Sequence, residues 1–123
     1  MTRDDIAAVM AKIPGLTALG NFPYEGGPKQ TDAELSQDRE RLLSSEESCS
    51  AACQWLATKA KTKTVNRKRS SYGLKHLAED EIGYVTNGAF IAAAVHSGFP
   101  YEILVDSPNV LIGISEKSLK STG

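Results

Sequence analysis

The sequence has no long hydrophobic run and few of the residues that build metal centres or disulfide frameworks. No stretch of its 123 residues approaches the ~20 apolar positions of a membrane-spanning helix, so we expect no membrane partner. The start of the chain is too acidic and too amphipathic for a signal peptide, which predicts a cytoplasmic protein. Cys49 and Cys53 share one face of a helical pattern and are expected to be small, half-buried apolar residues, with no metal bound.

The motifs of common catalytic sites are also missing. There is no glycine-rich phosphate loop, no His-Glu metal motif and no nucleophile elbow. His76 is expected at the surface or boundary of a helix. His96 is expected near a helix end, where a protonated imidazole favours the helix dipole. The run Glu79-Asp80-Glu81 is typical of a solvated face. We therefore predict that the protein is not an enzyme and needs no cofactor.

The near-neutral charge hides a strong segregation of charged residues. The formal net charge is −1. Residues 1–58 and 76–123 are each acidic, at −4, whereas residues 59–75 carry seven basic side chains and no acidic one. Such asymmetry indicates contact with a polyanion more directly than the total charge does.

Hydrophobic periodicity predicts helices in the first half of the chain. A short helix capped by Thr2 ends at Pro14-Gly15, and an irregular connection rich in proline and glycine covers 14–30. A long helix is expected from Thr31 to about residue 60, packed through one narrow apolar stripe.

The second half begins with the basic block, whose threonines and Val65 favour an extended strand. A helix capped by Ser70 or Ser71 then ends at Gly83, and a second helix capped by Thr86 or Asn87 ends at Gly98. Two short apolar runs around a turn predict a hairpin over Tyr101–Val105 and Val110–Ile114. The polar tail, 115–123, is expected to fray.

An extended basic segment followed by two helices resembles the ribbon-helix-helix family of DNA-binding repressors, the Arc and methionine-repressor kind. The resemblance covers roughly residues 60–98. The strand is Lys61-Thr-Lys-Thr-Val-Asn66, the first core-facing positions are Leu74, Leu77 and Ala78, and Gly83-Tyr-Val-Thr-Asn87 leads into the second helix. The resemblance implies a mainly α fold with short β. Its ribbon-helix-helix core is an intersubunit antiparallel β-ribbon plus two helices per chain, and a homodimer completes it.

The resemblance also implies which residues contact DNA. In one strand register Val65 points inward and the bases are contacted by Thr62, Thr64 and Asn66; the opposite register places Lys61, Lys63 and Val65 on the DNA. The phosphate contacts implied for the first register come from the basic side chains and from the start of the second helix: Lys61, Lys63, Arg67, Lys68, Arg69, Thr86, Asn87 and Gly88.

The sequence thus predicts three regions: an N-terminal helical arm (1–58), a ribbon-helix-helix core (59–99) and a C-terminal hairpin and tail (100–123). The leading interpretation is a dimeric bacterial or mobile-element transcriptional regulator that reads double-stranded DNA. One alternative is an antitoxin-like or phage-encoded inhibitor that binds a protein partner through the long acidic helix. Another keeps DNA binding but uses a monomeric helix-turn-helix over 71–98.

Overall fold

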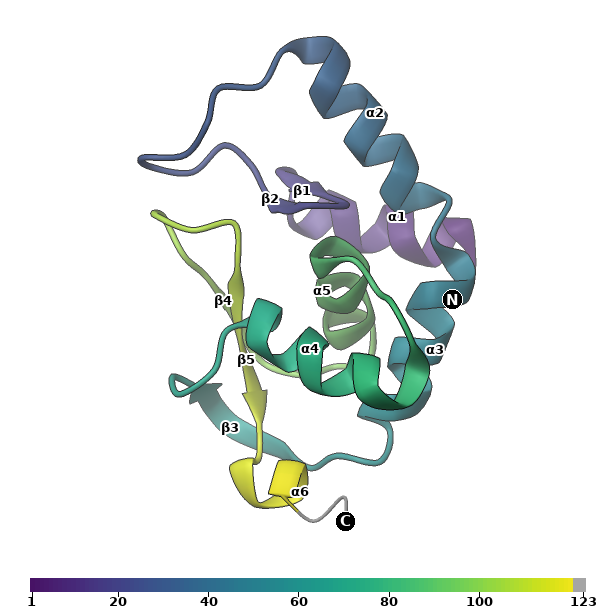
Figure 1. Ribbon diagram of the computed structural model, residues 1–123, viewed down its shortest axis with the longest axis vertical. Helices are drawn as coiled ribbons and strands as arrows, with labels where there is room; N and C mark the ends of the chain where they lie inside the picture. Colours follow the sequence, from purple (N-terminus) through teal and green to yellow (C-terminus); the bar gives the residue numbers. More distant parts are fainter. Residues whose placement is uncertain (121–123) are drawn as a thin grey trace.

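The computed structural model describes residues 1–120 and shows a mixed fold of helices and short strands (Figure 1). Within these residues the elements follow in the order α1 (Arg3–Lys12), β1 (Leu16–Thr17), β2 (Gly20–Asn21), α2 (Asp32–Leu43), α3 (Glu46–Leu56), β3 (Lys61–Asn66), α4 (Ser71–Ile82), α5 (Asn87–His96), β4 (Tyr101–Ile103), β5 (Val110–Ile114) and α6 (Glu116–Lys120). None of the described helices is long and apolar enough to cross a membrane.

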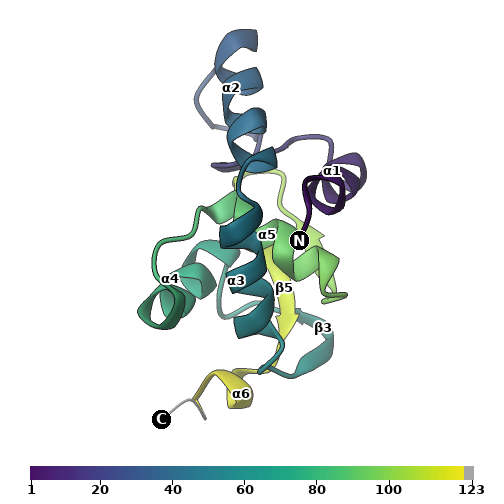
Figure 2. The same cartoon turned by 90° about the vertical axis from the view of Figure 1, so that its right-hand side faces the viewer.

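Helix α5 forms the centre of the hydrophobic core. All residues over 87–95 are buried, because this helix is apolar on every side and is enclosed on every side. Helices α1, α3 and α4 surround it (Figure 2), and Phe90 meets Trp55 of α3 with ring centroids 6.0 Å apart. Core side chains come from all three predicted regions, including Leu42 and Ile112. The regions therefore share one core.

The capping residues predicted for the helix starts are confirmed. At each start a side-chain hydroxyl accepts a hydrogen bond from the backbone N–H three residues on, and the four capping residues are Thr2, Thr31, Ser70 and Thr86. Gly83 ends α4 with a φ of +81°, a conformation that residues with a Cβ rarely adopt. Local sequence therefore determines where these helices begin and where α4 ends.

The single long helix predicted for 31–60 is wrong, because the chain breaks into α2 and α3 at Ser44 and Ser45. The Ser45 hydroxyl donates to the Arg41 carbonyl at 2.7 Å, and the Ser45 side chain makes no capping hydrogen bond to α3. Serine side chains that bond to the backbone compete with helix continuation. Figure 2 shows the consequence: α2 projects beyond α3, and only Leu42 of α2 is buried.

Three strands form an antiparallel sheet in the order β3-β5-β4. The hairpin of β4 and β5 confirms the predicted one, although its first strand ends at Ile103 rather than Val105. Strand β5 is buried along its whole length and lies between the other two. The tail differs from expectation, since Glu116–Lys120 form α6; residues 121–123 of the predicted frayed tail lie outside the described residues.

The strand predicted to pair with its copy in a second subunit has a partner within its own chain. Lys61 of β3 pairs with Ile114 and Asn66 pairs with Ile112, so β5 occupies one edge of β3. The apolar β5 needs a neighbour on each side to satisfy its backbone, and β3 supplies one of them. Over residues 1–120 the fold is therefore mixed helix and strand, and the predicted ribbon-helix-helix core is not confirmed. Since α5 is enclosed, it cannot serve as the exposed recognition helix of a helix-turn-helix.

Candidate nucleic-acid interface and an adjacent tyrosine pocket

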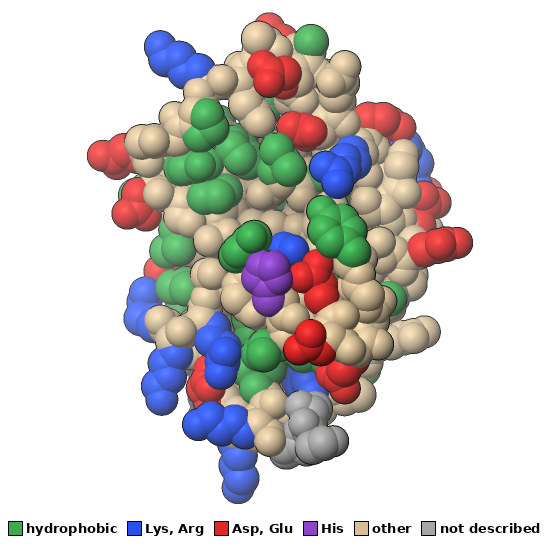
Figure 3. Space-filling model, in the orientation of Figure 1, with side chains coloured by type: hydrophobic (Ala, Val, Ile, Leu, Met, Phe, Trp, Pro, Cys, Tyr) green, Lys and Arg blue, Asp and Glu red, His purple; other side chains and the backbone are tan. Residues whose placement is uncertain are grey.

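Basic side chains gather around β3 and the turn that follows it. We call this the basic surface; it consists of Lys61, Lys63, Arg67, Lys68 and Arg69, with Lys117 and Lys120 of the neighbouring α6. Helix α6 is joined to β3 because the Ala60 N–H donates to Ser118 Oγ at 3.2 Å. In Figure 3, Lys and Arg side chains crowd the lower left, where Figure 1 places β3. The fold thus gathers cations from two segments far apart in sequence.

Two arginines of the basic surface are already paired with carboxylates. Both terminal nitrogens of Arg67 donate to Glu102, at 3.2 and 2.8 Å, and Arg69 Nε donates to Glu116 at 2.7 Å. The hydrogen bonds from Arg69 and then from Asn66 hold the pKa of Glu116 below its usual value. These ion pairs tie the turn after β3 to β4 and α6, so a bound phosphate would have to compete for the guanidinium groups.

The lysines of the basic surface are more available. Lys63 and Lys68 are exposed, and neither side chain forms a hydrogen bond or ion pair with another residue in the part of the chain described, 1–120. Lys61 is also exposed and its ammonium lies 5.3 Å from the centroid of the Phe99 ring. Of the predicted phosphate-contacting residues, these three lysines are the ones most free to meet an anion.

The regular strand register assumed for base contacts is wrong. The register of the pairing shifts between Lys61 and Asn66, so side chains do not simply alternate between two faces. Asn66 turns toward its own sheet and donates to the Ile114 carbonyl and to Glu116, at 3.3 and 2.9 Å. Val65, the predicted inward residue, is only half-buried.

The two threonines of this strand differ in exposure. The Thr62 hydroxyl donates to the Thr64 carbonyl at 2.7 Å, whereas the Thr64 side chain is exposed. Of the three residues predicted to contact bases, Thr64 is therefore the one whose side chain faces solvent.

The start of α5, predicted to hold a phosphate, is closed off by the segment between β1 and β2. The Gly88 N–H donates to the Ala18 carbonyl at 3.0 Å, and a Cβ at Gly88 would overlap the Thr17 carbonyl oxygen. Thr86 caps the helix, and both Thr86 and Asn87 are buried. Thr86, Asn87 and Gly88 are thus structural residues, and the phosphate contact predicted for them is not supported, because the Gly88 and Ala89 N–H groups already have partners within the protein.

A second feature, which we call the tyrosine pocket, lies along α4. Tyr72, Lys75, His76 and Glu79 occupy one face of the helix at the spacing i, i+3, i+4 and i+7, and Tyr84 follows in the next loop. With parts of the segments around residues 18 and 108, they line a cavity of about 430 Å³. Tyr72 is 50% exposed and Tyr84 71% exposed, which is unusual for such large rings.

Glu79 organises the charged groups of the tyrosine pocket. Its carboxylate lies 3.2 Å from the Lys75 ammonium and 2.9 Å from His76 Nδ1, and it accepts a hydrogen bond from the Val85 N–H at 3.2 Å. Burial acts to raise the pKa of Glu79, but the hydrogen bonds from Val85 and Lys75 outweigh it, so the pKa lies below its usual value. The carboxylate is therefore ionised and fixes both neighbouring side chains.

Lys75 fills the space between the two tyrosine rings. Its ammonium lies 5.1 Å from the Tyr72 centroid and 5.3 Å from the Tyr84 centroid, and its side chain is only 7% exposed. Beneath the pocket, Asn87 accepts from the Ser71 hydroxyl at 2.8 Å and donates to Asn109 at 2.9 Å. This buried network anchors the floor and the wall of the pocket.

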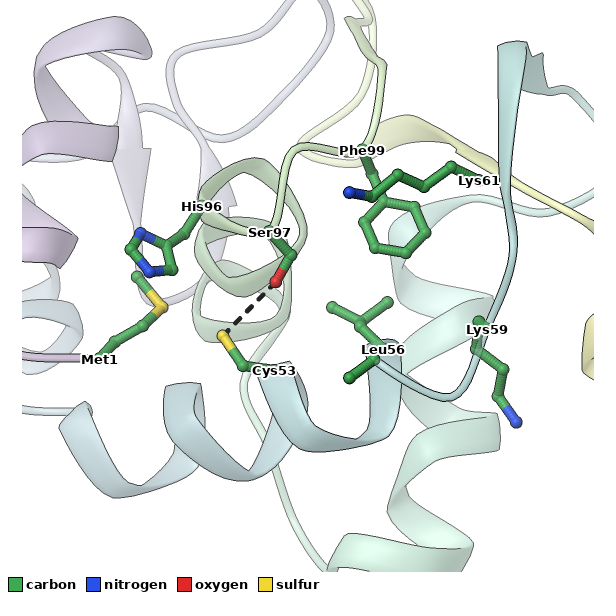
Figure 4. A pocket seen from close by; sticks show the side chains of 9 residues that line it. Met1, Cys53, Leu56, Lys59, Lys61, His96, Ser97 and Phe99 are labelled. Carbon is green, nitrogen blue, oxygen red and sulfur yellow. Dashed lines mark hydrogen bonds between the residues drawn. The ribbon is translucent and has the colours of Figure 1, made fainter.

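A second cavity, of about 650 Å³, is lined by residues from the end of α3, the start of β3 and the end of α5 (Figure 4). A cysteine and a histidine, Cys53 and His96, both line this cavity. Figure 4 shows His96 beside Met1, however, while Cys53 accepts a hydrogen bond from the Ser97 hydroxyl at 3.7 Å. The other cysteine, Cys49, does not line this cavity, and burial raises its pKa to about 12, so that thiol stays protonated. The cavity therefore shows no nucleophile-and-base pair.

Sequence patterns alone did not reveal the tyrosine pocket, although a signal for it existed. The sequence predicts His76 as a surface or boundary residue of the helix and Glu79 as part of a solvated acidic run. Their spacing from Tyr72 and Lys75 on one predicted helix face was sufficient to group them. Tyr84 and the residues near position 108 had no such signal, because only the tertiary structure brings them to α4.

Comparisons with protein-family models, with curated proteins and with solved structures find no match. Within residues 1–120 no three His, Cys, Asp or Glu side chains converge as a metal ion would require. Function is therefore inferred from the basic surface and the tyrosine pocket themselves.

Proposed function

We propose that the protein binds DNA through the basic surface, and that it acts as a regulator of transcription. The observation that supports this proposal is the gathering of cations from β3, its following turn and α6 on a surface whose main carboxylates are Glu102 and Glu116. Lysines with no competing carboxylate neutralise phosphates and release counterions, which gives affinity and strong salt dependence. The acidic remainder of the chain would orient the DNA onto this one surface.

The predicted homodimer remains part of the proposal in a changed form. Strand β3 lies at the edge of its sheet, so its outer edge is open to β3 of a second copy. Such pairing would join two sheets and place two basic surfaces side by side. Exposed Thr64 would then be the residue through which this ribbon distinguishes bases. Light scattering tests the dimer separately. If the protein is a monomer and still binds DNA, the two-subunit ribbon is ruled out while binding through the basic surface is retained.

The binding proposal is tested by titrating a labelled 20-base-pair duplex at several salt concentrations. The double variant Lys63→Ala/Lys68→Ala should bind more weakly, and its slope of log affinity against log salt should fall by roughly two, about 0.9 for each phosphate that is no longer neutralised. Lys12→Ala/Lys29→Ala is the matched control, because both of these lysines are exposed and lie outside the basic surface. Equal slopes for the two double variants would contradict the proposal.

The alternative function, binding of a protein partner, is favoured by one observation. Helix α2 is acidic, projects from the body and buries only Leu42. A partner that docks there would still bind when Lys63 and Lys68 are replaced. Loss of binding on Glu34→Lys/Gln37→Lys, two exposed positions of α2, would support this alternative.

A further inference from the structure

We infer that the tyrosine pocket receives an unpaired nucleobase from a nucleic-acid strand whose phosphates lie on the basic surface. This inference rests on the proposed function and specifies what part of the nucleic acid is recognised. It concerns Tyr72 and Tyr84, whose exposed rings have no role in the core. Aromatic rings at a protein surface stack on bases that are unpaired in a single strand or flipped out of a duplex.

The contents of the pocket exclude a cationic ligand. Two aromatic rings and a carboxylate form the kind of cage that binds an ammonium group. Here the Lys75 ammonium already occupies that position, within 5.3 Å of both ring centroids and 3.2 Å from Glu79. A second cation would meet like charge at close range.

An anionic ligand is also poorly matched to the interior of the pocket. The charge of Lys75 is balanced by that of Glu79, and the remaining lining groups are neutral tyrosine, threonine, amide and aliphatic side chains with one imidazole. A flat, neutral, polarizable ring is the ligand that this arrangement fits. The negative charge of a nucleotide would lie outside, where the basic side chains are.

The distance between the two features suits one nucleotide chain. Tyr72 follows Arg69 by three residues, so their Cα atoms lie no more than about 11 Å apart. Figure 1 shows α4 in the foreground with β3 below it, on the face that Figure 3 draws. A strand that contacts the turn with its phosphates therefore needs to extend only one or two nucleotides to reach the pocket.

The pocket also carries polar groups for the edge of a base. His76 is held by Glu79 through Nδ1, which leaves Nε2 directed away from that contact. The Asn109 side chain accepts from Asn87 through Oδ1, which leaves its NH₂ group as a donor. Rings for stacking, with a few fixed polar groups at the rim, are typical of sites that recognise unpaired bases.

The test compares three labelled probes: a 20-nucleotide single strand of thymidine, an abasic strand of the same length and charge, and a 20-base-pair duplex. The wild type should bind the thymidine strand about ten-fold more tightly than the abasic strand. Tyr84→Ala should abolish that difference and leave binding of the abasic strand unchanged. Tyr84→Phe should preserve the difference, because stacking needs the ring and not the hydroxyl. Tyr84 is 71% exposed, so neither change threatens folding.

The outcomes separate the two proposals. If none of the three probes binds, the proposed nucleic-acid function is wrong and the pocket inference falls with it. If the probes bind but the thymidine and abasic strands bind equally, or Tyr84→Ala leaves their ratio unchanged, the basic surface stands and the pocket inference is overturned. If Tyr84→Ala weakens the binding of all three probes equally, the Tyr84 ring affects binding through the basic surface and not by stacking on a base. The pocket inference is then likewise overturned.

Discussion

Lys75 and Glu79 form an ion pair of 3.2 Å on successive turns of α4, and both side chains are largely buried, at 7% and 17% exposure. The Glu79 carboxylate also contacts His76 and accepts a hydrogen bond from the Val85 N–H. One acidic side chain therefore fixes the cation between two tyrosines, the imidazole at the rim and the loop after α4. The geometry of the tyrosine pocket depends on it.

Glu79→Gln should destabilise the protein, because it leaves the Lys75 ammonium buried without its counter-charge. We expect the free energy of unfolding to fall by about 1–3 kcal/mol, below the range for a fully buried pair since Glu79 is partly solvated. Urea denaturation measures this change. The control is Asp80→Asn, the same kind of change at an exposed neighbouring position. Equal midpoints for the two variants would mean that the ion pair contributes nothing to stability.

The same carboxylate predicts an acid-sensitive stability. The pKa of Glu79 is lowered in the folded state below its usual 4.5, despite burial, by the Val85 and Lys75 hydrogen bonds. A carboxyl whose folded-state pKa is depressed stabilises the fold above its unfolded-state pKa, and that contribution is lost as the pH falls through the folded-state value. Wild type should therefore lose more stability than Glu79→Gln between about pH 5 and about pH 3. Parallel pH profiles would contradict this assignment.

Two glycines should respond to alanine with opposite signs. Gly88→Ala places a Cβ against the Thr17 carbonyl, and we expect a loss of at least about 2 kcal/mol as the segment between β1 and β2 is displaced from α5. Gly73→Ala meets nothing within 4 Å inside α4, and should stabilise the protein by up to about 1 kcal/mol. Thermal or urea unfolding measures both. A Gly88→Ala protein as stable as wild type would show that the start of α5 is open after all.

Removing a carboxylate from the basic surface should strengthen DNA binding. Glu116→Gln removes the carboxylate that lies 2.7 Å from Arg69 Nε, so the surface loses one negative charge and its net charge rises by one. Duplex affinity at low salt should rise several-fold. The slope of log affinity against log salt should steepen by up to about 0.9, the contribution of one phosphate contact. The matched control is Glu25→Gln, an exposed carboxylate on the connection between β2 and α2. An unchanged affinity for Glu116→Gln would indicate that Arg69 lies away from the bound DNA.

The starts of α1, α2, α4 and α5 and the end of α4 were predictable because their causes are local. The hydroxyls of Thr2, Thr31, Ser70 and Thr86 each bond to an N–H only three residues away, and Gly83 supplies a backbone conformation by itself. The hairpin after Pro100 was predictable for the same reason, since a short segment with turn-forming residues joins two apolar runs.

Predictions that depended on distant partners were the ones that changed. The sequence alone could not show that β5 covers one edge of β3, that Ala18 bonds to Gly88, or that Asn66 turns toward Ile114 and Glu116. Each of these contacts joins segments that are far apart in the chain. A pattern of residue types indicates which backbone groups need a partner, but the packing of the core decides which partner they find.

The sequence by itself determined the segregation of charge, with a basic segment of seven cations between two acidic ones, and the boundaries of most helices. Only the tertiary structure decided how those charges are used: β3 joins the sheet of its own chain, Glu102 and Glu116 pair with two of the arginines, and Lys63 and Lys68 stay open to solvent. It also decided that Tyr84 closes a pocket over Lys75 and Glu79. The physical reason is that charge and capping act over a few residues or through solvent, whereas burial depends on which surfaces pack together.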